Sequence, residues 1–452
     1  MASVDTAELV ERIWSRDATL WTGRDEAKWL GWLDEPRRMA ERVGELEAFA
    51  AETIDFAHVV LLGMGGSSLA PEVLRRTFGG GRLHVLDTTH PAAVRRLAEA
   101  LDLEQTLFLV ASKSGTTLET RCHLDFFWER VGRGECFVAI TDPGSELEAL
   151  ARDRGFLRIF AGEPTVGGRY SALSAFGIVP AALLGIDLTR LFERVEEMVE
   201  ACRLAEGNPG LELGEALGDG WREGRDKVLI NPDPGGFGLW AEQLLAESTG
   251  KQGKGLVPVP AATADGPDRQ AAEVRIPDPY ELGQEFYRWE FATAVAGSIL
   301  EINPFDQPNV QEAKDRTNDV LSGPDRGLPL DRSGSVEELL AGVEPPEYVC
   351  IQAFIDPDRE AGLEPLLARA RETGCVVTHG LGPRYLHSTG QLHKGGPPTG
   401  RFIQVLDDPG EELAIPNRDF GFARLIQAQA AGDLVSLEGR GRPIVRVNLE
   451  EV

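Results

Sequence analysis

The sequence predicts an α/β protein that contains two similar units of helix-covered parallel sheet and a smaller third α/β unit. Short apolar runs alternate with segments of helical length, a pattern typical of parallel sheets buried on both faces. The alternation restarts after Gly207–Gly210 and again after the Gly-, Pro- and Asp-rich stretch Ser322–Ser335. A chain of 452 residues is long enough for two or three domains with substantial cores.

A helical arm is expected at residues 1–55 and the first α/β unit at 56–206. In the arm, helices are predicted at Ala7–Trp14 and Asp34–Glu52, and four tryptophans are expected to pack it onto the main body. The predicted strands of the first unit are Val59–Leu62, Leu83–Leu86, Leu107–Ala111 and Phe137–Ile140. The predicted helices are Pro71–Thr77, Pro91–Leu101, one that ends near Val131, one that begins at Ser145, Ser171–Leu184 and Thr189–Ala205.

The second unit is expected at residues 211–321 and the third at 336–452, with Gly207–Gly210 as the clearest linker. In the second unit the predicted strands are Lys227–Ile230 and Leu256–Val259, and the predicted helices are Gly236–Glu247, Glu281–Leu300 and Val310–Leu321. In the third, the strands are Tyr348–Ile355, Val376–Thr378, Arg401–Leu406 and Ile444–Val447, and the helices are Leu363–Thr373 and Phe420–Gly432.

Composition narrows the class of function. The net charge of −27 argues against nucleic-acid binding, and it requires that an anionic substrate be captured by local donors. No apolar run is long enough to span a membrane, and no secretion signal precedes the first helix. Five cysteines without close pairing or metal-ligand spacing fit reduced thiols, so a cytoplasmic protein is expected.

Two turns rich in glycine and serine follow predicted strands, at Gly65-Gly-Ser-Ser68 and Ser112-Lys-Ser-Gly-Thr-Thr117. The second places four hydroxyl groups and several backbone N–H groups at the start of a helix. The helix dipole and the unpaired N–H donors favour an anion there, so a phosphate site is predicted. The alternative for each turn is an ordinary N-cap with small residues.

Three further segments carry candidate polar groups. Gln243 and Glu247 are four residues apart, hence on one face of a predicted helix. Arg169 is flanked by glycines in Gly167-Gly-Arg-Tyr-Ser171, so its guanidinium could approach a ligand and stabilise an oxyanion. Gln307 lies at a turn, with Lys314 two helical turns later. Taken singly, each has the alternative of an ordinary surface or helix-start residue.

Taken together, these segments resemble the glucose-6-phosphate isomerase family. Gly-Gly-Arg-Tyr-Ser-Ala-Leu-Ser (167–174) and Phe-Asp-Gln-x-x-Val-x-x-x-Lys (305–314) are similar to its two signature segments. Its other site segments are matched in order by Gly-Gly-Ser (65–67), Ser-Lys-Ser-Gly-Thr-Thr (112–117) and Glu-Ser-Thr-Gly-Lys (247–251). Because of His387-Ser-Thr-Gly-Gln-Leu-His-Lys-Gly395, the sequence looks closest to the isomerase half of bacterial transaldolase–isomerase fusions.

The resemblance implies two sugar-isomerase (SIS) domains, a homodimer, and interconversion of glucose 6-phosphate and fructose 6-phosphate through a cis-enediol without metal or other cofactor. It implies that Glu247 is the base, that Arg169 stabilises the enediolate, and that Lys314 assists ring opening. Ser112, Ser114 and Thr117, with Lys113 nearby, would hold the phosphate. The sugar would be lined by Gly66, Ser67, Gln243 and Gln307.

Two positions depart from the family pattern. Glu285 lies where the family commonly has a histidine for ring opening, so it is the candidate for that role, and Gln311 replaces a glutamate. The third unit contains His379, His387 and His393, for which structural or subunit-contact roles are expected over metal binding. Two alternatives stay open: a non-catalytic sugar-phosphate-binding regulator, and an isomerase that also accepts mannose 6-phosphate.

Overall fold

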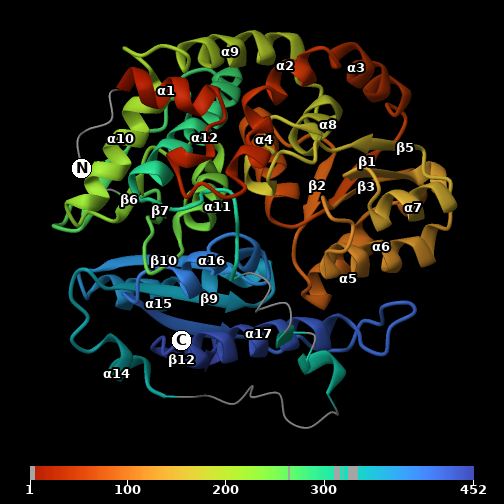
Figure 1. Ribbon diagram of the computed structural model, residues 1–452. Coiled ribbons are helices and arrows are strands. Elements are labelled where there is room, and N and C mark those ends of the chain that lie inside the picture. Colours follow the sequence, from red (N-terminus) through yellow and green to blue (C-terminus); the bar gives the residue numbers. More distant parts are fainter. Residues whose placement is uncertain (1–5, 263–264, 310–315, 318, 324–333) are drawn as a thin grey trace.

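The computed structural model describes residues 6–262, 265–309, 316–317, 319–323 and 334–452. Within these residues the chain forms three sheets of five, three and four strands, and every strand pairing between the named strands is parallel. Helices cover the sheets, as Figure 1 shows. The predicted α/β class is therefore confirmed.

The first sheet has the strand order β2-β1-β3-β4-β5. Its strands are β1 His58–Leu62, β2 Leu83–Leu86, β3 Thr106–Ala111, β4 Phe137–Thr141 and β5 Arg158–Ala161. The helices of this part of the chain are α4 Leu69–Phe78, α5 Pro91–Ala100, α6 Leu118–Val131, α7 Glu146–Asp153, α8 Ala175–Leu183 and α9 Leu188–Ala201.

The central strands of this sheet are buried on both faces, which explains their continuous apolar sequences. Val59 and Leu61 of β1 belong to one hydrophobic cluster, whereas Val60 and Leu62 belong to another on the opposite face. The first of these clusters also contains much of the N-terminal arm, whose helices are α1 Thr6–Trp14, α2 Glu35–Ala40 and α3 Val43–Glu52.

The tryptophans of the arm pack on the body as predicted. Trp32 is 1% exposed and stacks on Tyr170 at a centroid distance of 5.3 Å. Trp21 donates from Nε1 to the carbonyl of Ala294 at 2.8 Å. The arm thereby braces the segment that holds Arg169, which immediately precedes Tyr170.

The second sheet has the order β7-β6-β8. Its strands are β6 Lys227–Ile230, β7 Val257–Pro260 and β8 Arg269–Ala272, and the helices of this part are α10 Pro209–Arg222, α11 Gly238–Thr249 and α12 Leu282–Ile299. Within the predicted linker Gly207–Gly210, Asn208 caps α10, with its side chain accepting from the N–H groups of Gly210 and Leu211.

The third sheet has the order β10-β9-β11-β12. Its strands are β9 Tyr348–Phe354, β10 Val376–Leu381, β11 Gly400–Leu406 and β12 Ile444–Asn448, and its helices are α14 Val336–Leu340, α15 Glu364–Arg371, α16 Gly390–Gly395 and α17 Phe422–Gly439. We call residues 334–452 the C-terminal unit. In Figure 1 it lies, in blue, beneath the other two.

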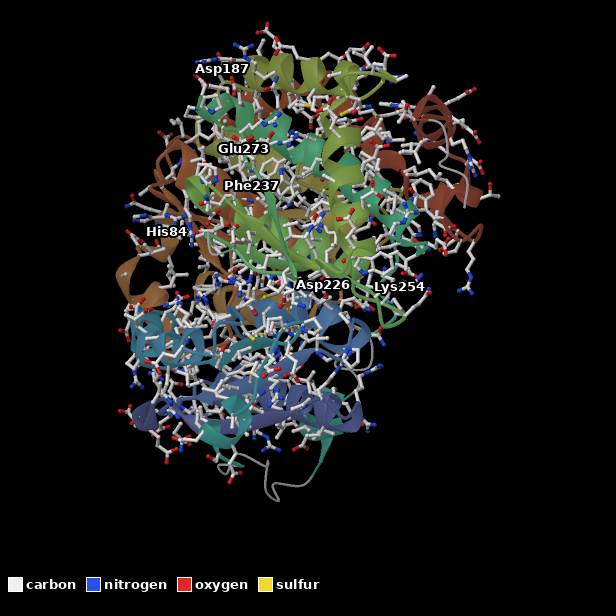
Figure 2. The ribbon with its side chains drawn as sticks, turned by 90° about the vertical axis from the view of Figure 1, so that its left-hand side faces the viewer. His84, Asp187, Asp226, Phe237, Lys254 and Glu273 are labelled. Atoms are coloured by element: carbon white, nitrogen blue, oxygen red, sulfur yellow. The ribbon has the colours of Figure 1, made fainter. Side chains whose placement is uncertain are left out.

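The C-terminal unit is packed against both of the preceding units. Its Phe422 stacks on His123 of α6, and its Tyr348 shares a hydrophobic cluster with Leu229 of β6. Figure 2 labels Asp226 where the second unit meets the C-terminal unit. Lys227 Nζ donates to the carboxylate of Asp226 and to the carbonyl of Pro346. Lys227 is fully buried, so this ion pair lies inside the interface.

Among the described residues, no helix combines the length and the apolarity that a membrane-crossing helix requires.

His393 of α16 should make the fold sensitive to acid. The residue is 3% exposed, and burial lowers the pKa of its imidazole from 6.5 to about 3. Between these two values the unfolded chain binds a proton that the folded chain does not, so the free energy of unfolding decreases as the pH falls from 6.5. Above that pH the contribution of His393 is constant.

Urea unfolding of the wild type and of His393→Gln at about pH 7 and pH 4 tests this. The wild type should lose about 3 kcal/mol more than the variant between the two pH values. Equal losses in the two proteins would show that His393 does not carry this acid sensitivity.

Candidate active site

The predicted phosphate loop lies at the carboxyl ends of adjacent parallel strands. In the order β2-β1-β3-β4-β5, β2 pairs with one side of β1 and β3 pairs with the other. The connection after β1 therefore runs in one direction along the sheet, and the connection after β3 runs in the other. The turns after these two strands therefore diverge and leave a crevice, which is where ligands bind in open α/β sheets. The 3₁₀ turn Gly65–Ser67 follows β1, and Ser112–Thr117 follows β3.

Ser112–Thr117 is a tight loop rich in hydroxyl groups that leads into α6. Gly115 has a φ of +72°, which bends the loop back so that its N–H donates to Ser112 Oγ at 3.2 Å. Ser112 Oγ lies 3.0 Å from Thr117 Oγ1, and Ser114 Oγ lies 2.9 Å from Thr116 Oγ1. Thr117 is the N-cap residue of α6, a helix of 14 residues, but its side chain makes no capping hydrogen bond. It therefore does not satisfy the backbone N–H groups of the first turn, which are the groups that bind anions at helix starts.

The position of Lys113 differs from the expectation that it helps to hold the phosphate. Its Nζ binds the carboxylate of Asp142 and the carbonyl of Glu163, the latter at 3.1 Å. The lysine therefore ties the loop to the ends of the neighbouring strands, and its charge is matched by Asp142. An anion in the loop would rest mainly on backbone N–H groups and hydroxyls.

Arg169 is the most heavily bonded side chain of the site. It is 2% exposed, and its three nitrogens donate to four acceptors. Nε binds Ser248 Oγ at 2.8 Å, Nη1 binds Gln307 Oε1 at 2.9 Å, and Nη2 binds the carbonyls of Pro304 and Asp306 at 2.7 and 2.9 Å. The guanidinium is thus fixed in place before any ligand binds.

Glu247 lies next to this guanidinium, in the last turn of α11. Its Oε1 is 3.5 Å from Arg169 Nη1, and its Oε2 accepts from Gln243 Nε2 at 3.0 Å. The side chain of Glu247 is 12% exposed, in contrast to the buried Arg169. The carboxylate of Glu247 therefore contacts the guanidinium of Arg169, and only the carboxylate is accessible to solvent.

The orientation of the Gln243 amide follows from its hydrogen-bond partners. Its Nε2 faces two acceptors, Glu247 Oε2 and the carbonyl of His387 at 2.8 Å, so the nitrogen must be on that side. Its Oε1 is buried and has no hydrogen-bond partner in the described part of the chain. Because a buried acceptor without a partner is costly, this oxygen suits a ligand hydroxyl.

Gly66 allows the two loops to touch. A Cβ built on it would lie 1.9 Å from the carbonyl oxygen of Gly168, so only glycine permits this approach. Ser171 Oγ, on the same loop as Arg169, is 3.3 Å from the carbonyl of Gly66. Ser67, in the same 3₁₀ turn as Gly66, is 9% exposed. The structure therefore brings together Gly66, Ser67, Arg169, Gln243, Glu247 and Gln307.

Lys251, the last residue of the segment Glu247–Lys251, also belongs to the site although the sequence indicated no role for it. It is 2% exposed, and its Nζ donates to the carbonyl of Asn303 at 2.7 Å and to Asp306 Oδ1 at 2.7 Å. Burial, followed by the charge of Arg169, lowers the pKa of Lys251 to about 8. Lys251 and Arg169 together hold the segment 303–307 over the site. Lys314 lies outside the described residues.

Glu285 is not brought together with these residues. It is 2% exposed in α12, where its carboxylate accepts from Arg288 Nη1 at 3.0 Å and from Trp289 Nε1 at 3.1 Å. Arg288 in turn donates to the carbonyl of Glu273 at 3.2 Å. The structure thus places Glu285 in an ion pair on its own helix, with none of the predicted site residues among its hydrogen-bond partners.

The C-terminal unit contributes a residue that was not assigned to the site. The carbonyl of His387 accepts from Gln243, and His387 Nε2 lies 2.9 Å from Glu119 Oε1 in the first turn of α6. His393 is buried against Gln352 and Cys350, and His379 pairs with Glu360 on the surface. Over the described residues, no group of three or more His, Cys, Asp or Glu side chains could hold a metal ion.

Comparison with known proteins supports the resemblance to the glucose-6-phosphate isomerase family. Residues 27–205 match the family model Phosphoglucose isomerase. Glucose-6-phosphate isomerase of Nostoc sp. is 31% identical over 272 residues, 56% of this chain and 51% of that protein. The enzyme of the same name from Carboxydothermus hydrogenoformans is 28% identical over 396 residues, 65% of this chain and 85% of that protein.

The resemblance to the glucose-6-phosphate isomerase family is therefore confirmed, whereas the similarity to fusion proteins stays a prediction. The chain spans about half the length of several curated relatives, such as that of Nostoc sp.. The family model covers Arg169 and the phosphate loop but ends before Glu247.

Two solved structures share the fold. A hypothetical protein from Thermus thermophilus aligns with a TM-score of 0.50 at 21% identity, over 98% of this chain and 83% of that one. A glucose-6-phosphate isomerase from Chlamydia trachomatis aligns with a TM-score of 0.55 at 18% identity, over 70% and 83%. At these identities the alignment supports the fold alone.

Replacing Gly66 by alanine should disturb the site through backbone contact alone. The new methyl group must push the Gly168 carbonyl away, and overpacking of this kind costs about 1–3 kcal/mol. Gly66→Ala should therefore unfold at a lower temperature than the wild type. Gly44→Ala is the matched control, because a Cβ on Gly44 meets nothing within 4 Å. Equal melting temperatures for the two variants would contradict the close approach of the two loops.

Proposed function

We propose that this chain, which is similar to the glucose-6-phosphate isomerases, catalyses the reversible isomerisation of D-glucose 6-phosphate and D-fructose 6-phosphate. The observation that carries the proposal is the meeting of Glu247 and Arg169, at 3.5 Å, beside an unpaired hydrogen-bond acceptor on Gln243 in the described part of the chain. An accessible carboxylate next to a fixed guanidinium suits proton transfer on a carbon whose neighbour develops oxyanion charge.

In the proposed reaction, Glu247 takes the proton from C2 of the open-chain aldose. The electron pair of that C–H bond forms the C1–C2 double bond of an enediolate, and the carbonyl electrons move to O1. The proton then returns from Glu247 to C1 as the carbonyl forms at C2, and the hydroxyl proton passes from O2 to O1. One base therefore serves both directions, and the reaction needs no external oxidant or reductant.

Arg169 would stabilise the enediolate electrostatically. Its donors are already fixed by Ser248, Gln307 and two carbonyls, so little reorganisation accompanies the development of charge. The same rigidity would exclude substrates whose oxygens do not reach this position.

The loop Ser112–Thr117 would hold the 6-phosphate through N–H groups and hydroxyls at the start of α6. Anchoring one end of the substrate positions its other end at Glu247, which lowers the entropic part of the barrier. The net charge of −27 makes these local donors necessary. The family resemblance adds a role for Lys314 in ring opening, assembly as a homodimer, and activity without a metal or other cofactor.

The test is a coupled assay for glucose 6-phosphate formed from fructose 6-phosphate, run with and without a chelator. The wild type should turn over in both conditions. Glu247→Gln should lose about 10²–10⁴-fold in rate, because the amide cannot accept the proton. Fructose 6-phosphate should still raise the melting temperature of this variant, since phosphate anchoring does not need Glu247.

Glu212→Gln, at an exposed position on α10, is the matched control and should keep full activity. A Glu247→Gln variant with more than about a tenth of wild-type activity would exclude Glu247 as the base. A wild type without turnover that is still stabilised by fructose 6-phosphate would instead identify a sugar-phosphate-binding module. Formation of mannose 6-phosphate in the same reaction would identify an isomerase of wider range.

A further inference from the structure

The residues 303–309, which we call the 303–309 segment, lie over the site and are held at two points. The first part of the segment is bound by Arg169 and Lys251, whose side chains donate to its carbonyls. Gln307 and Pro308 follow, and both are exposed. The position of Gln307 therefore depends on how the segment is held beyond Pro308.

Gln391 of the C-terminal unit holds the segment at this second point. It belongs to α16 and is 0% exposed. Its Oε1 accepts from the backbone N–H of Asn309 at 2.9 Å, and its Nε2 donates to Asn309 Oδ1 at 2.8 Å. The same Nε2 donates to the carbonyl of Gly250 at 2.8 Å, and Gly250 is the C-cap residue of the helix that carries Glu247. One buried amide therefore ties the end of the segment to the end of α11.

Two glycines allow α16 to approach both partners of this amide. A Cβ built on Gly250 would lie 2.3 Å from Cα of Leu392, and one built on Gly395 would lie 2.5 Å from Asn309 Oδ1. Gly253 N–H also donates to the carbonyl of Gly395 at 2.9 Å. Because these contacts involve backbone atoms, α16 is fixed against the segment and the end of α11, and the amide that it carries is fixed with it.

Gln307 offers free hydrogen-bond donors beside Arg169. Its Oε1 accepts from Arg169 Nη1 at 2.9 Å, and because a guanidinium only donates, this contact sets the orientation of the amide. Its Nε2 has no acceptor within the part of the chain that the structure describes. The same Arg169 nitrogen lies 3.5 Å from Glu247 Oε1, so a sugar that reaches Glu247 comes close to the free amide N–H groups of Gln307.

We propose that Gln391 is a positioning residue for the substrate: it fixes the end of the 303–309 segment so that the amide of Gln307 can bind a sugar oxygen. Without Gln391, the N–H and Oδ1 of Asn309 and the carbonyl of Gly250 lose their partner. Among the polar contacts of the described residues, only those of the first part would then hold the segment. The inference rests on the proposed function, and it makes the C-terminal unit a determinant of substrate affinity.

Gln391→Ala tests the role through kcat and KM of the isomerase assay with fructose 6-phosphate. A contact made equally in the ground state and the transition state affects KM alone, so KM should rise about tenfold while kcat changes little. Gln352→Ala is the matched control, because Gln352 is another buried glutamine of the same unit, and its amide faces His393. This control should lower the melting temperature but keep the wild-type KM. An unchanged KM in Gln391→Ala would overturn the role.

A double-mutant cycle separates positioning from a purely structural role. In the Gln307→Ala background there is no amide left to position, so adding Gln391→Ala should change KM little. An equal rise of KM with and without Gln307 would show that Gln391 does not act through this residue. Asn309→Ala, which removes one acceptor of the Gln391 amide from outside the C-terminal unit, should raise KM by a smaller factor. If Gln391→Ala does not fold, the same cycle with Asn309→Ala decides.

Calorimetric titration of the same variants with fructose 6-phosphate makes the outcome independent of turnover. A wild type that binds the sugar phosphate without turnover, with the coupling between Gln391 and Gln307 present in Kd, would refute the proposed function and support the role of Gln391. Turnover without this coupling would keep the function and refute the role. A wild type that neither binds nor converts fructose 6-phosphate would refute both.

Discussion

The structure of the site depends on the buried guanidinium of Arg169. A charge that is 2% exposed is tolerated only when its donors are paired, and here they reach Ser248 on α11 and the segment 304–307. One side chain thereby joins a loop of the first unit, a helix of the second and the segment after α12. Glu247 lies where these three meet, so its position follows from the bonds of Arg169.

Lys251 adds a second constraint on the same segment. Its ammonium binds Asn303 and Asp306, so two buried cations hold the same short segment. Each lies in the neighbourhood of the other, and the charge of Arg169 contributes to the lowered pKa of Lys251. The cost of placing two cations together is offset by the carbonyls of the segment and by the carboxylates of Asp306 and Glu247. The segment 303–307 therefore accepts hydrogen bonds from both Arg169 and Lys251.

The sequence was sufficient to predict the strands that are buried on both faces, because short continuous apolar runs between turn residues are typical of such strands. It was insufficient for β5 and β8, since Arg158–Ala161 and Arg269–Ala272 begin with polar or charged residues at the sheet edge. Helix α10 was not predicted, and four glycines, which are poor helix formers, interrupt its sequence. In the structure Gly214 and Gly218 allow α12 to approach, with built Cβ atoms 2.5 Å from Val295 and 2.6 Å from Ile299.

The candidate site likewise contains residues that the sequence indicated and contacts that it did not. Glu247, Arg169 and the phosphate loop lie in local segments whose residue order carries the signal. The contact between His387 and Glu119 joins residues 268 positions apart, and no pattern in either segment indicates the other. Glu285 was assigned from its place in a motif, but its helix sets Arg288 and Trp289 one turn later, where they bind its carboxylate.

These long-range contacts indicate that the C-terminal unit does more than cover the other two units. If docking alone were its role, apolar packing such as that of Phe422 on α6 and Tyr348 on the second sheet would suffice. Instead, polar groups of this unit cross the interface at the crevice, where Gln429 and His387 both bind Glu119. Buried polar contacts add little to stability compared with apolar ones, but they fix geometry. A unit that only covered the sheets would not need to fix an imidazole between the phosphate loop and the neighbour of Glu247.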